Sequence, residues 1–346
     1  MMKLFFAFSL FFACALCPAA CAAGVRDGLT LAAGQALPAL FPFFAASGLL
    51  VRCGLAEAFS GLAARPLAFL YGLPSAAAPA LLLGLTGGYP VGVATAAELV
   101  SQNALDAETA ARVNTFCNCA SPGFCIGLVG LGVFGSARTG AVLYGIHIAA
   151  ALLTGLFTAR GATPPERAAY ASKRTETPFS AAFCGAVQQA AATSLTVTAF
   201  ITMFSILLTL LEPILGALPC GSVLAGAIEL TNGLDALPLL PLPSGALLTL
   251  ASFLLGFGGL AVQFQVRAIA APQGIGCGLF LPAKLLHGTI AAALTALLFR
   301  LSPEALTVFA PVQPAARHWG WTVCVLAALL LLLARIGSGK APGNTL

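Results

Sequence analysis

Long apolar runs separated by short connections are the feature of this sequence that most limits its fold. A membrane-spanning helix needs about 20 consecutive apolar residues. Only 8% of the residues are charged, compared with about 25% in ordinary soluble domains, so a water-soluble fold is excluded. We predict an all-α, polytopic membrane protein with about eight to ten membrane helices, some of them broken or re-entrant half-helices. The runs lie at about residues 4–23, 37–52, 76–97, 122–135, 138–159, 183–211, 217–230, 245–264, 277–299 and 320–334.

The few charged residues indicate membrane topology and not a nucleic-acid site. Sixteen Lys and Arg residues and 11 Asp and Glu residues give a net charge of +5. The basic residues lie in short connections, which is typical of cytoplasmic loops. Segment 160–178 contains four of them and a Pro164–Pro165 pair, and this composition predicts a cytoplasmic linker. We expect a lipid bilayer as a partner and no nucleic acid.

Residues 1–23 fit either a signal peptide or a first membrane helix. The apolar run 4–23 is longer than the roughly 7–15 residues of a signal-peptide core, and Pro18–Cys21 is a poor lipobox, so we favour a retained helix. Cys14 and Cys17 form a CxxC in the middle of this run. No polar ligand lies near them in the sequence, and redox or metal cysteines need more polar surroundings. The 11 cysteines mostly lie in apolar runs, where Cys acts as a small hydrophobe.

The linker separates two halves that resemble each other weakly. Leu85–Gly88 (LTGG) recurs as Leu230–Gly233 (LTNG) 145 residues later, and the interruption at Phe116–Pro122 has a counterpart at Phe257–Gln263, 141 residues later. Interruptions at corresponding places in two halves are typical of duplicated transporters. We therefore predict two pseudo-symmetric, inverted repeats. The predicted domains are an N-terminal helix with its connector (1–35), repeat 1 (36–160), the polar linker (161–180), repeat 2 (181–300) and a C-terminal membrane helix with its tail (301–346).

The sequence around Asn118 predicts a helix that stops and restarts. Ser121 is a good N-cap, and Pro122 suits the first helical position because no N–H is needed there. A half-helix that begins at this point directs its free N–H groups and the positive end of its dipole into the membrane interior. Such a helix N-terminus favours binding of an anionic group. Unpaired backbone groups at this depth must line a cavity or face other protein. Further breaks are predicted at Gly87, Gly88 and Pro90 in the first half and at Gly233, Gly258 and Gly259 in the second.

Polar side chains inside the apolar runs are candidates for solute binding. Glu229 would be costly at membrane depth, which predicts either a pairing cation, Lys284 or Arg267, or a bound proton. Lys284 lies one helical turn from His287 and could neutralise an anionic solute, but snorkelling to the headgroups explains it equally well. We place the anion site where the half-helix at Ser121 meets the segment 231–233. The predicted binding residues are Asn118, Ser121, Glu229, Thr231, Asn232, Gln263 and Lys284.

The sequence contains no recognised catalytic motif. HExxH, GxSxG and the phosphate-binding GxxxxGK[ST] do not occur, and Asn232–Asp235 lacks the second aspartate of an intramembrane aspartyl protease. His147 is isolated in an apolar run and is expected to be a hydrogen-bonded packing residue. We predict no enzymatic activity, no cofactor and no metal.

Five short motifs follow one another along the two predicted repeats. They are LPALFPFF at 37–44, GLTGGYPVG at 84–92, FCNCASP at 116–122, ELTNG at 229–233 and GFGGLAVQ at 256–263. This ordered set, between about residues 35 and 300, resembles the YlbJ-type sporulation integral membrane proteins. The chain departs from that pattern at Cys117 and Cys119, where hydroxyl-bearing residues often flank the Asn.

The resemblance implies a membrane protein of endospore-forming bacteria that is needed for late spore development. It further implies a nucleoside-recognition, or Gate, domain, which is shared with concentrative nucleoside transporters and ferrous-iron transporters. The family is associated with moving dipicolinic acid across the outer forespore membrane. The half-helix N-termini expected above would suit the two carboxylates of that solute.

Two functions remain open at this point. The first is a transporter of a small anionic solute, with dipicolinate as the first candidate, a nucleoside-like solute as the second, and a coupling proton or ion. The alternative is a membrane scaffold for spore-envelope assembly that carries no solute. Polar groups such as Glu229 and Asn118 at membrane depth favour transport, because a scaffold gains nothing from their cost. The direction of transport, the coupling ion and the oligomeric state stay open.

Overall fold

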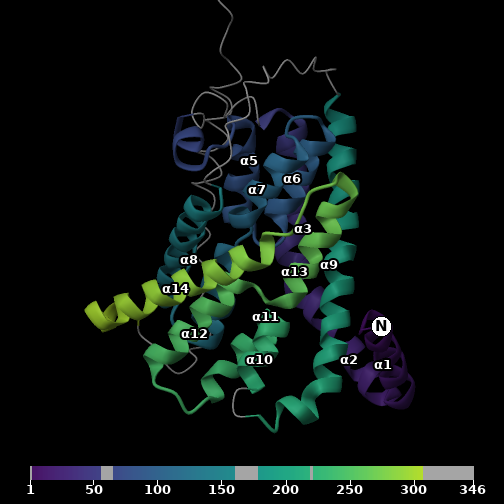
Figure 1. Ribbon diagram of the computed structural model, residues 1–346, viewed down its shortest axis with the longest axis vertical. Coiled ribbons are helices and arrows are strands. Elements are labelled where there is room, and N and C mark those ends of the chain that lie inside the picture. Colours follow the sequence, from purple (N-terminus) through teal and green to yellow (C-terminus); the bar gives the residue numbers. More distant parts are fainter. Residues whose placement is uncertain (1, 56–64, 160–177, 219–220, 307–346) are drawn as a thin grey trace, which may run out of the picture. The chain divides into compact units, whose positions relative to one another are not determined.

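A computed structural model describes residues 2–55, 65–159, 178–218 and 221–306, and every regular element in these ranges is a helix (Figure 1). The all-α prediction is therefore confirmed. The elements are α1 (Met2–Leu16), α2 (Pro18–Leu31), η1 (Ala32–Ala36), α3 (Leu37–Arg52), η2 (Ser75–Ala77), α5 (Ala78–Gly87), α6 (Val91–Ser101), α7 (Ala107–Cys117), η3 (Gly123–Val133), α8 (Ala137–Thr158), α9 (Phe179–Leu215), α10 (Gly221–Ile228), α11 (Leu230–Ala236), η4 (Leu237–Leu239), α12 (Ser244–Phe257), α13 (Gly259–Ala270), η5 (Ala271–Gln273), α14 (Phe280–Leu301) and η6 (Pro303–Ala305).

Several of these helices are long and apolar enough to cross a bilayer. Within the described ranges there are four such spans: α8, α9, α14 and the stretch Ser244–Gln273, which contains α12 and α13. Two sharply bent helix pairs raise the number to six if each pair counts as one span. The chain is thus a multi-pass membrane protein. The expected membrane helix at 320–334 and most of the linker 161–180 lie outside the described residues.

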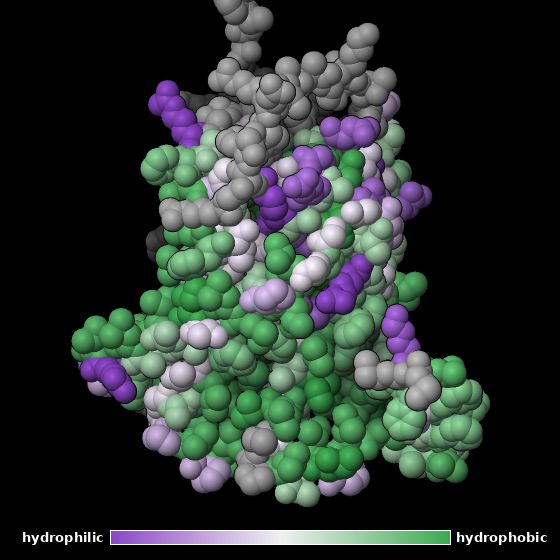
Figure 2. All heavy atoms as spheres, viewed as in Figure 1, coloured by the Kyte–Doolittle hydropathy of each residue, from purple (hydrophilic) through white to green (hydrophobic). Residues whose placement is uncertain are grey.

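Polar and apolar side chains occupy different parts of the molecular surface. On the face drawn in Figure 2, polar residues gather over the upper half, where Figure 1 places α5, α6 and α7, and the lower half is hydrophobic. Exposed phenylalanines and leucines are frequent among the described residues, for example Phe5, Phe69 and Leu195, which are 74%, 87% and 71% exposed. Such side chains suit contact with lipid.

The first apolar run is not one straight helix. α1 ends at Leu16, α2 begins at Pro18, and the bent pair meets at 99°. Proline disfavours a helical conformation in the residue before it, and Cys17 accordingly has φ −120° and ψ 55°. The structure therefore replaces the expected single helix over residues 4–23 with two helices.

Most helix breaks lie where glycine and proline predict them. α5 ends at Gly87, and Gly88 has φ +93°, a conformation that residues with a Cβ rarely adopt. α6 then begins directly after Pro90. α7 ends at Cys117, and the next helix restarts at Pro122 and continues as η3. In the second half, α12 and α13 are separated at Gly258, where φ is +81°.

Gly233 is a correction to the predicted breaks, because it lies inside α11 and the interruption falls at Glu229. The missing side chain serves close packing there. A Cβ at Gly233 would overlap the Cα of Gly226 on α10. α10 and α11 can therefore approach this closely only because neither glycine has a Cβ.

The two halves present their elements in the same order. Each has a pair of short helices that fold against each other (α5 and α6, α10 and α11), then a helix interrupted near its middle (α7 with η3, α12 with α13), then a long helix (α8, α14). This order agrees with the predicted duplication. The superposition of the halves as inverted repeats remains a prediction.

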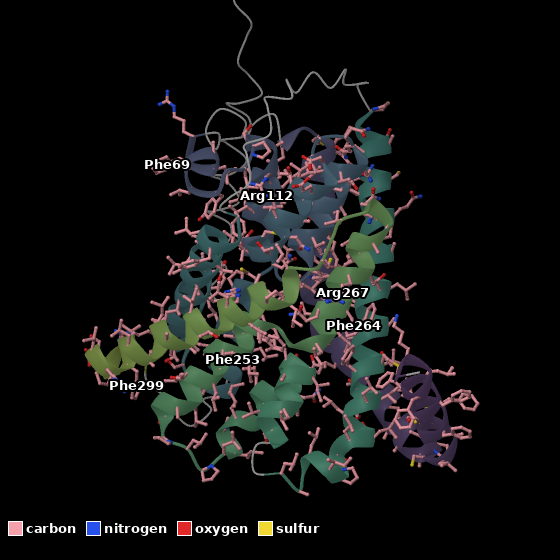
Figure 3. All side chains as sticks on the ribbon, viewed as in Figure 1. Phe69, Arg112, Phe253, Phe264, Arg267 and Phe299 are labelled. Atoms are coloured by element: carbon pink, nitrogen blue, oxygen red, sulfur yellow. The ribbon has the colours of Figure 1, made fainter. Side chains whose placement is uncertain are left out.

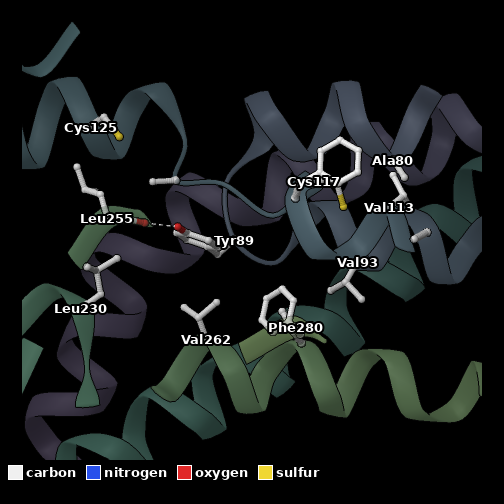
Figure 4. Packing of buried hydrophobic residues seen from close by; sticks show 14 of the residues in the cluster. Ala80, Tyr89, Val93, Val113, Cys117, Cys125, Leu230, Leu255, Val262 and Phe280 are labelled. Atoms are coloured by element: carbon white, nitrogen blue, oxygen red, sulfur yellow. Dashed lines mark hydrogen bonds between the residues drawn. The ribbon is translucent and has the colours of Figure 1, made fainter. Parts of the chain in front are cut away.

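Buried apolar residues from both halves form one core. Figure 4 shows Tyr89, Val93 and Cys117 of the first half close to Val262 and Phe280 of the second. α14 packs against both α12 and α8. The core therefore joins the helix breaks of the two halves.

The contact between α12 and α14 gives a first testable prediction. A Cβ at Gly256 would lie 2.5 Å from the Cα of Gly288, so Gly256→Ala must push the two helices apart, at about 1–3 kcal/mol. We expect a lower melting temperature in detergent. Gly145→Ala is the matched control because its Cβ meets nothing within 4 Å, and helix propensity alone should make it neutral or slightly stabilising. Equal melting temperatures for the two variants would contradict the close packing.

Candidate functional site

A cavity of about 330 Å³ lies where the helix breaks of the two halves meet. This volume is near the lower end of the roughly 300–1,000 Å³ of small-molecule sites. Its wall is mostly apolar, with α9 supplying Val197 and Ile201. The polar side chains on the wall come from Tyr89, Ser121, Glu229, Thr231 and Gln265.

Two half-helices begin at the cavity wall, and each is capped by its own side chain. The hydroxyl of Ser121 accepts a hydrogen bond from the backbone N–H of Phe124 at 3.1 Å, which confirms the predicted N-cap. The carboxylate of Glu229 accepts hydrogen bonds from the backbone N–H of Asn232 at 2.9 Å and from its side-chain amide at 2.8 Å. Ser121 and Thr231 line the same cavity, so the two half-helix starts face one space.

Glu229 is buried, with 5% of its surface exposed, and it has no cationic partner among the described residues. Arg267 is exposed on α13 (Figure 3), and Lys284 lies in a separate cluster. The expected ion pair of Glu229 with either cation is therefore wrong. The amide donors of Asn232 satisfy the carboxylate instead, as they must for a buried polar group. No Lys, Arg or His occurs among the described residues of the wall.

Asn118 is fully buried but does not reach the cavity wall. Its side-chain oxygen accepts a hydrogen bond from the backbone N–H of Val93 at 2.9 Å. Its amide donates to the backbone oxygen of Asn114 at 3.1 Å and also to the side-chain oxygen of Asn114. Asn118 thus satisfies an N–H in the first turn of α6, which would otherwise lack a partner.

The two glutamines of α13 have different positions. The amide of Gln263 donates to the backbone oxygen of Phe257 at 3.2 Å and lies off the cavity wall. Gln265 is on the wall and was not among the predicted binding residues. Val262 and Ala261 lie three and four residues before Gln265, so the three side chains share one face of α13. The sequence did not show that this face of the helix lines the cavity.

Lys284 is completely buried in a second polar cluster. Its ammonium group donates to the backbone oxygen of Asn118 at 2.9 Å and lies 2.8 Å from Nδ1 of His287. It also sits 5.1 Å from the ring centroid of Tyr89, a distance that suits a cation–π interaction. Snorkelling to the headgroups is therefore wrong for Lys284.

Two histidines complete this cluster. Nε2 of His287 lies 2.9 Å from the backbone oxygen of His147, and Nε2 of His147 accepts a hydrogen bond from the backbone N–H of Ala120 at 2.9 Å. The two rings stack with centroids 4.5 Å apart. His147 is thus the hydrogen-bonded packing residue that we expected. Because Ala120 and Tyr89 line the cavity, the cluster supports the wall from behind.

The same cluster contains three side chains of metal-binding type. The ligand atoms of Cys119, His147 and His287 all lie within 4.8 Å of one another. Both nitrogens of His287 and one nitrogen of His147 already have hydrogen-bond partners. The ammonium group of Lys284, next to His287, would also repel a metal cation. The geometry therefore fits a hydrogen-bonded cluster better than a metal centre.

Comparison with known proteins identifies one informative relative. The chain is 27% identical over 314 residues to the sporulation integral membrane protein YlbJ of Bacillus subtilis (strain 168), a match that covers 80% of this chain and 76% of that protein. No protein-family model matches the chain, and no solved structure matches it significantly. The similarity confirms the family resemblance of the motifs, whereas the Gate domain remains a prediction.

Proposed function

Since the chain is a relative of the YlbJ-type sporulation integral membrane proteins, we propose that it carries a small solute across a membrane of the developing spore. The observation that supports transport is the cavity at which helix breaks from both halves meet. Irregular backbone at membrane depth is tolerated where it lines a cavity or is buried in protein, and interrupted helices at a repeat interface are the usual transporter binding site. A purely structural membrane protein needs neither feature, and we propose no catalytic step.

Dipicolinate is the solute that we propose first. The apolar wall suits its aromatic ring, and the side chains of Ser121, Thr231 and Gln265 can donate hydrogen bonds to its carboxyl groups. Because no basic side chain lines the described wall, the negative charge needs compensation. We propose that a coupling proton, held by Glu229 or by the solute, or a coupling cation supplies it. The proposed location is the outer forespore membrane, as the family resemblance implies.

A nucleoside-like solute is the second candidate, and a specific observation favours it. Glu229 and Gln265 offer hydrogen-bond acceptors, and the absence of a basic side chain from the described wall suits a neutral solute that has several donors. Dipicolinate carries a negative charge that must be compensated and a nucleoside does not. Measuring the uptake of each solute separately therefore distinguishes the two candidates.

Liposomes that contain only this protein provide the test. We expect them to take up dipicolinate faster than empty liposomes do, and a proton gradient should change the rate. Uridine in parallel liposomes tests the second candidate. Uptake of uridine and not of dipicolinate would replace the first solute by the second. Uptake of neither solute would contradict the transport proposal and favour the scaffold.

A further inference from the structure

We propose that a second cavity, built around Arg52, is the vestibule through which a carboxylate-bearing solute reaches the central cavity. This inference rests on the proposed transport function. The second cavity has a volume of about 370 Å³ and a more polar wall than the first. Its polar side chains include Arg52, Glu98, Ser101, Gln189, Thr196 and Gln273.

Three helices line both cavities, and a fourth helix runs from one cavity to the other. α3, α9 and α13 each contribute side chains to the two walls, and α6 runs from the Gly88–Tyr89 segment at the central cavity to Glu98 at the second. α3 packs against α6 and α9, and α13 packs against the same two helices, which closes a ring (Figure 1). Thr193 lines the second cavity, and Val197, one turn further along the same face of α9, lines the first, so the two spaces adjoin along this helix.

A short apolar barrier separates the two cavities. Phe44 of α3, Val91 of α6 and Val197 of α9 belong to one buried cluster at this level. Val91, Thr95 and Glu98 are spaced by four and three residues and therefore form one stripe along α6. The hydroxyl of Thr95 is buried and has no hydrogen-bond partner among the described residues. This hydroxyl could offer a hydrogen bond to a solute that moves along the stripe.

Arg52 is only partly neutralised in the second cavity. One of its terminal nitrogens lies 2.9 Å from Oε1 of Glu98, and the amide of Gln102 donates to the same oxygen at 2.7 Å. Nε of Arg52 is buried and has no hydrogen-bond partner in the part of the chain that the structure describes. A guanidinium group binds a carboxylate best through two parallel N–H donors, and Glu98 does not use the donor at Nε.

The position of Arg52 is also built into the packing. A Cβ at Gly185 of α9 would lie 2.9 Å from a terminal nitrogen of Arg52, so the glycine leaves room for the guanidinium. We infer that a carboxylate of the solute takes the free donor and displaces Glu98, which occupies the guanidinium when no solute is bound. Arg52 would then select anionic solutes before they enter the central cavity, whose described wall has no cation.

Labelling of single residues on α9 tests the vestibule independently of transport. We would introduce Thr196→Cys or Leu195→Cys into the full chain in liposomes. Each variant would be treated with methanethiosulfonate reagents of negative or positive charge, and the label read at that residue by peptide mass spectrometry, so that native cysteines stay in place. Leu195 is the matched control because it is the residue next to Thr196, its side chain is 71% exposed, and it does not line the cavity. We expect the cysteine at 196 to react at least about tenfold faster, because the cavity gives it access to water.

The charge of the reagent tests the role of Arg52. The cysteine in Thr196→Cys should react faster with the anionic reagent than with the cationic one. Adding Arg52→Gln should lower the ratio of the anionic to the cationic labelling rate by about fivefold, because it removes one nearby positive charge from a partly screened site. Equal labelling at 195 and 196 would overturn the vestibule. Labelling at 196 with an unchanged charge ratio would overturn the role of Arg52. If both labelling results are as expected but liposomes take up neither dipicolinate nor uridine, the proposed transport function is contradicted and the vestibule is not.

Discussion

Glu229→Gln is expected to reduce dipicolinate uptake into liposomes by at least about tenfold, which corresponds to about 1.4 kcal/mol. The buried carboxylate has no cation beside it in the described structure, and its partners are the N–H groups of Asn232. A proton on Glu229 would therefore be the direct way to reduce the negative charge when an anion enters the cavity. Gln keeps the shape and an oxygen that accepts the same hydrogen bonds, but it cannot exchange a proton.

Two further variants separate charge from structure at this position. Glu212→Gln removes an exposed carboxylate from α9 and should leave uptake unchanged. Glu229→Ala also removes the cap of α11, which costs about 0.5–2 kcal/mol, so it should lower the melting temperature whereas Glu229→Gln should not. Wild-type uptake in Glu229→Gln, at normal abundance in the membrane, would contradict a coupling role for this carboxylate.

The sequence was most informative where a local rule decides the backbone. Gly88 must adopt a positive φ, and Ser121 followed by a proline starts a helix. Both rules act within a few residues, so the breaks could be predicted before any tertiary contact was known. The restarts at Ser121 and Leu230 then meet at one cavity, which the sequence indicated only through the order of its motifs.

The sequence was least informative where the partner is distant along the chain. Gly233 reads as a break, but it is a contact point because α10 and α11 fold against each other. Arg52 and Glu98 form an ion pair across two helices, and neither residue lies in a motif that predicts the other. Lys284 has an apolar sequence environment that fits either a headgroup contact or a buried site, and only its bond to Asn118 decides between them.

Lys284→Met is expected to impair both folding stability and uptake. The ammonium group contacts the Asn118 oxygen and His287 Nδ1 at hydrogen-bond distance and lies 5.1 Å from the centroid of the Tyr89 ring. The Asn118 oxygen lies at the C-terminal end of α7, where the helix dipole favours a cation. The charge is therefore well accommodated, and its removal leaves two buried acceptors without a donor, at about 1–3 kcal/mol each.

This loss should appear as a melting temperature lower by roughly 5 °C or more in detergent. Leu285→Met is the matched control, because that neighbouring side chain on α14 is 44% exposed and makes none of these bonds; it should behave as wild type. Lys284→Gln keeps two N–H donors on a shorter side chain and should fall between the two.

In the proposed transporter, Lys284 would act on the solute through the backbone and not by contact. Its bond to Asn118, together with the bond from Ala120 to His147, fixes the segment that carries Ala120 and Ser121 to the cavity wall. A positioning role of this kind predicts that Lys284→Met weakens dipicolinate binding even at temperatures where the variant is fully folded, and that Lys284→Gln restores part of it. If Lys284→Met melted lower but bound and carried dipicolinate like the wild type below that temperature, the lysine would stabilise the fold alone, and the shape of the cavity would not depend on the contact between the two halves.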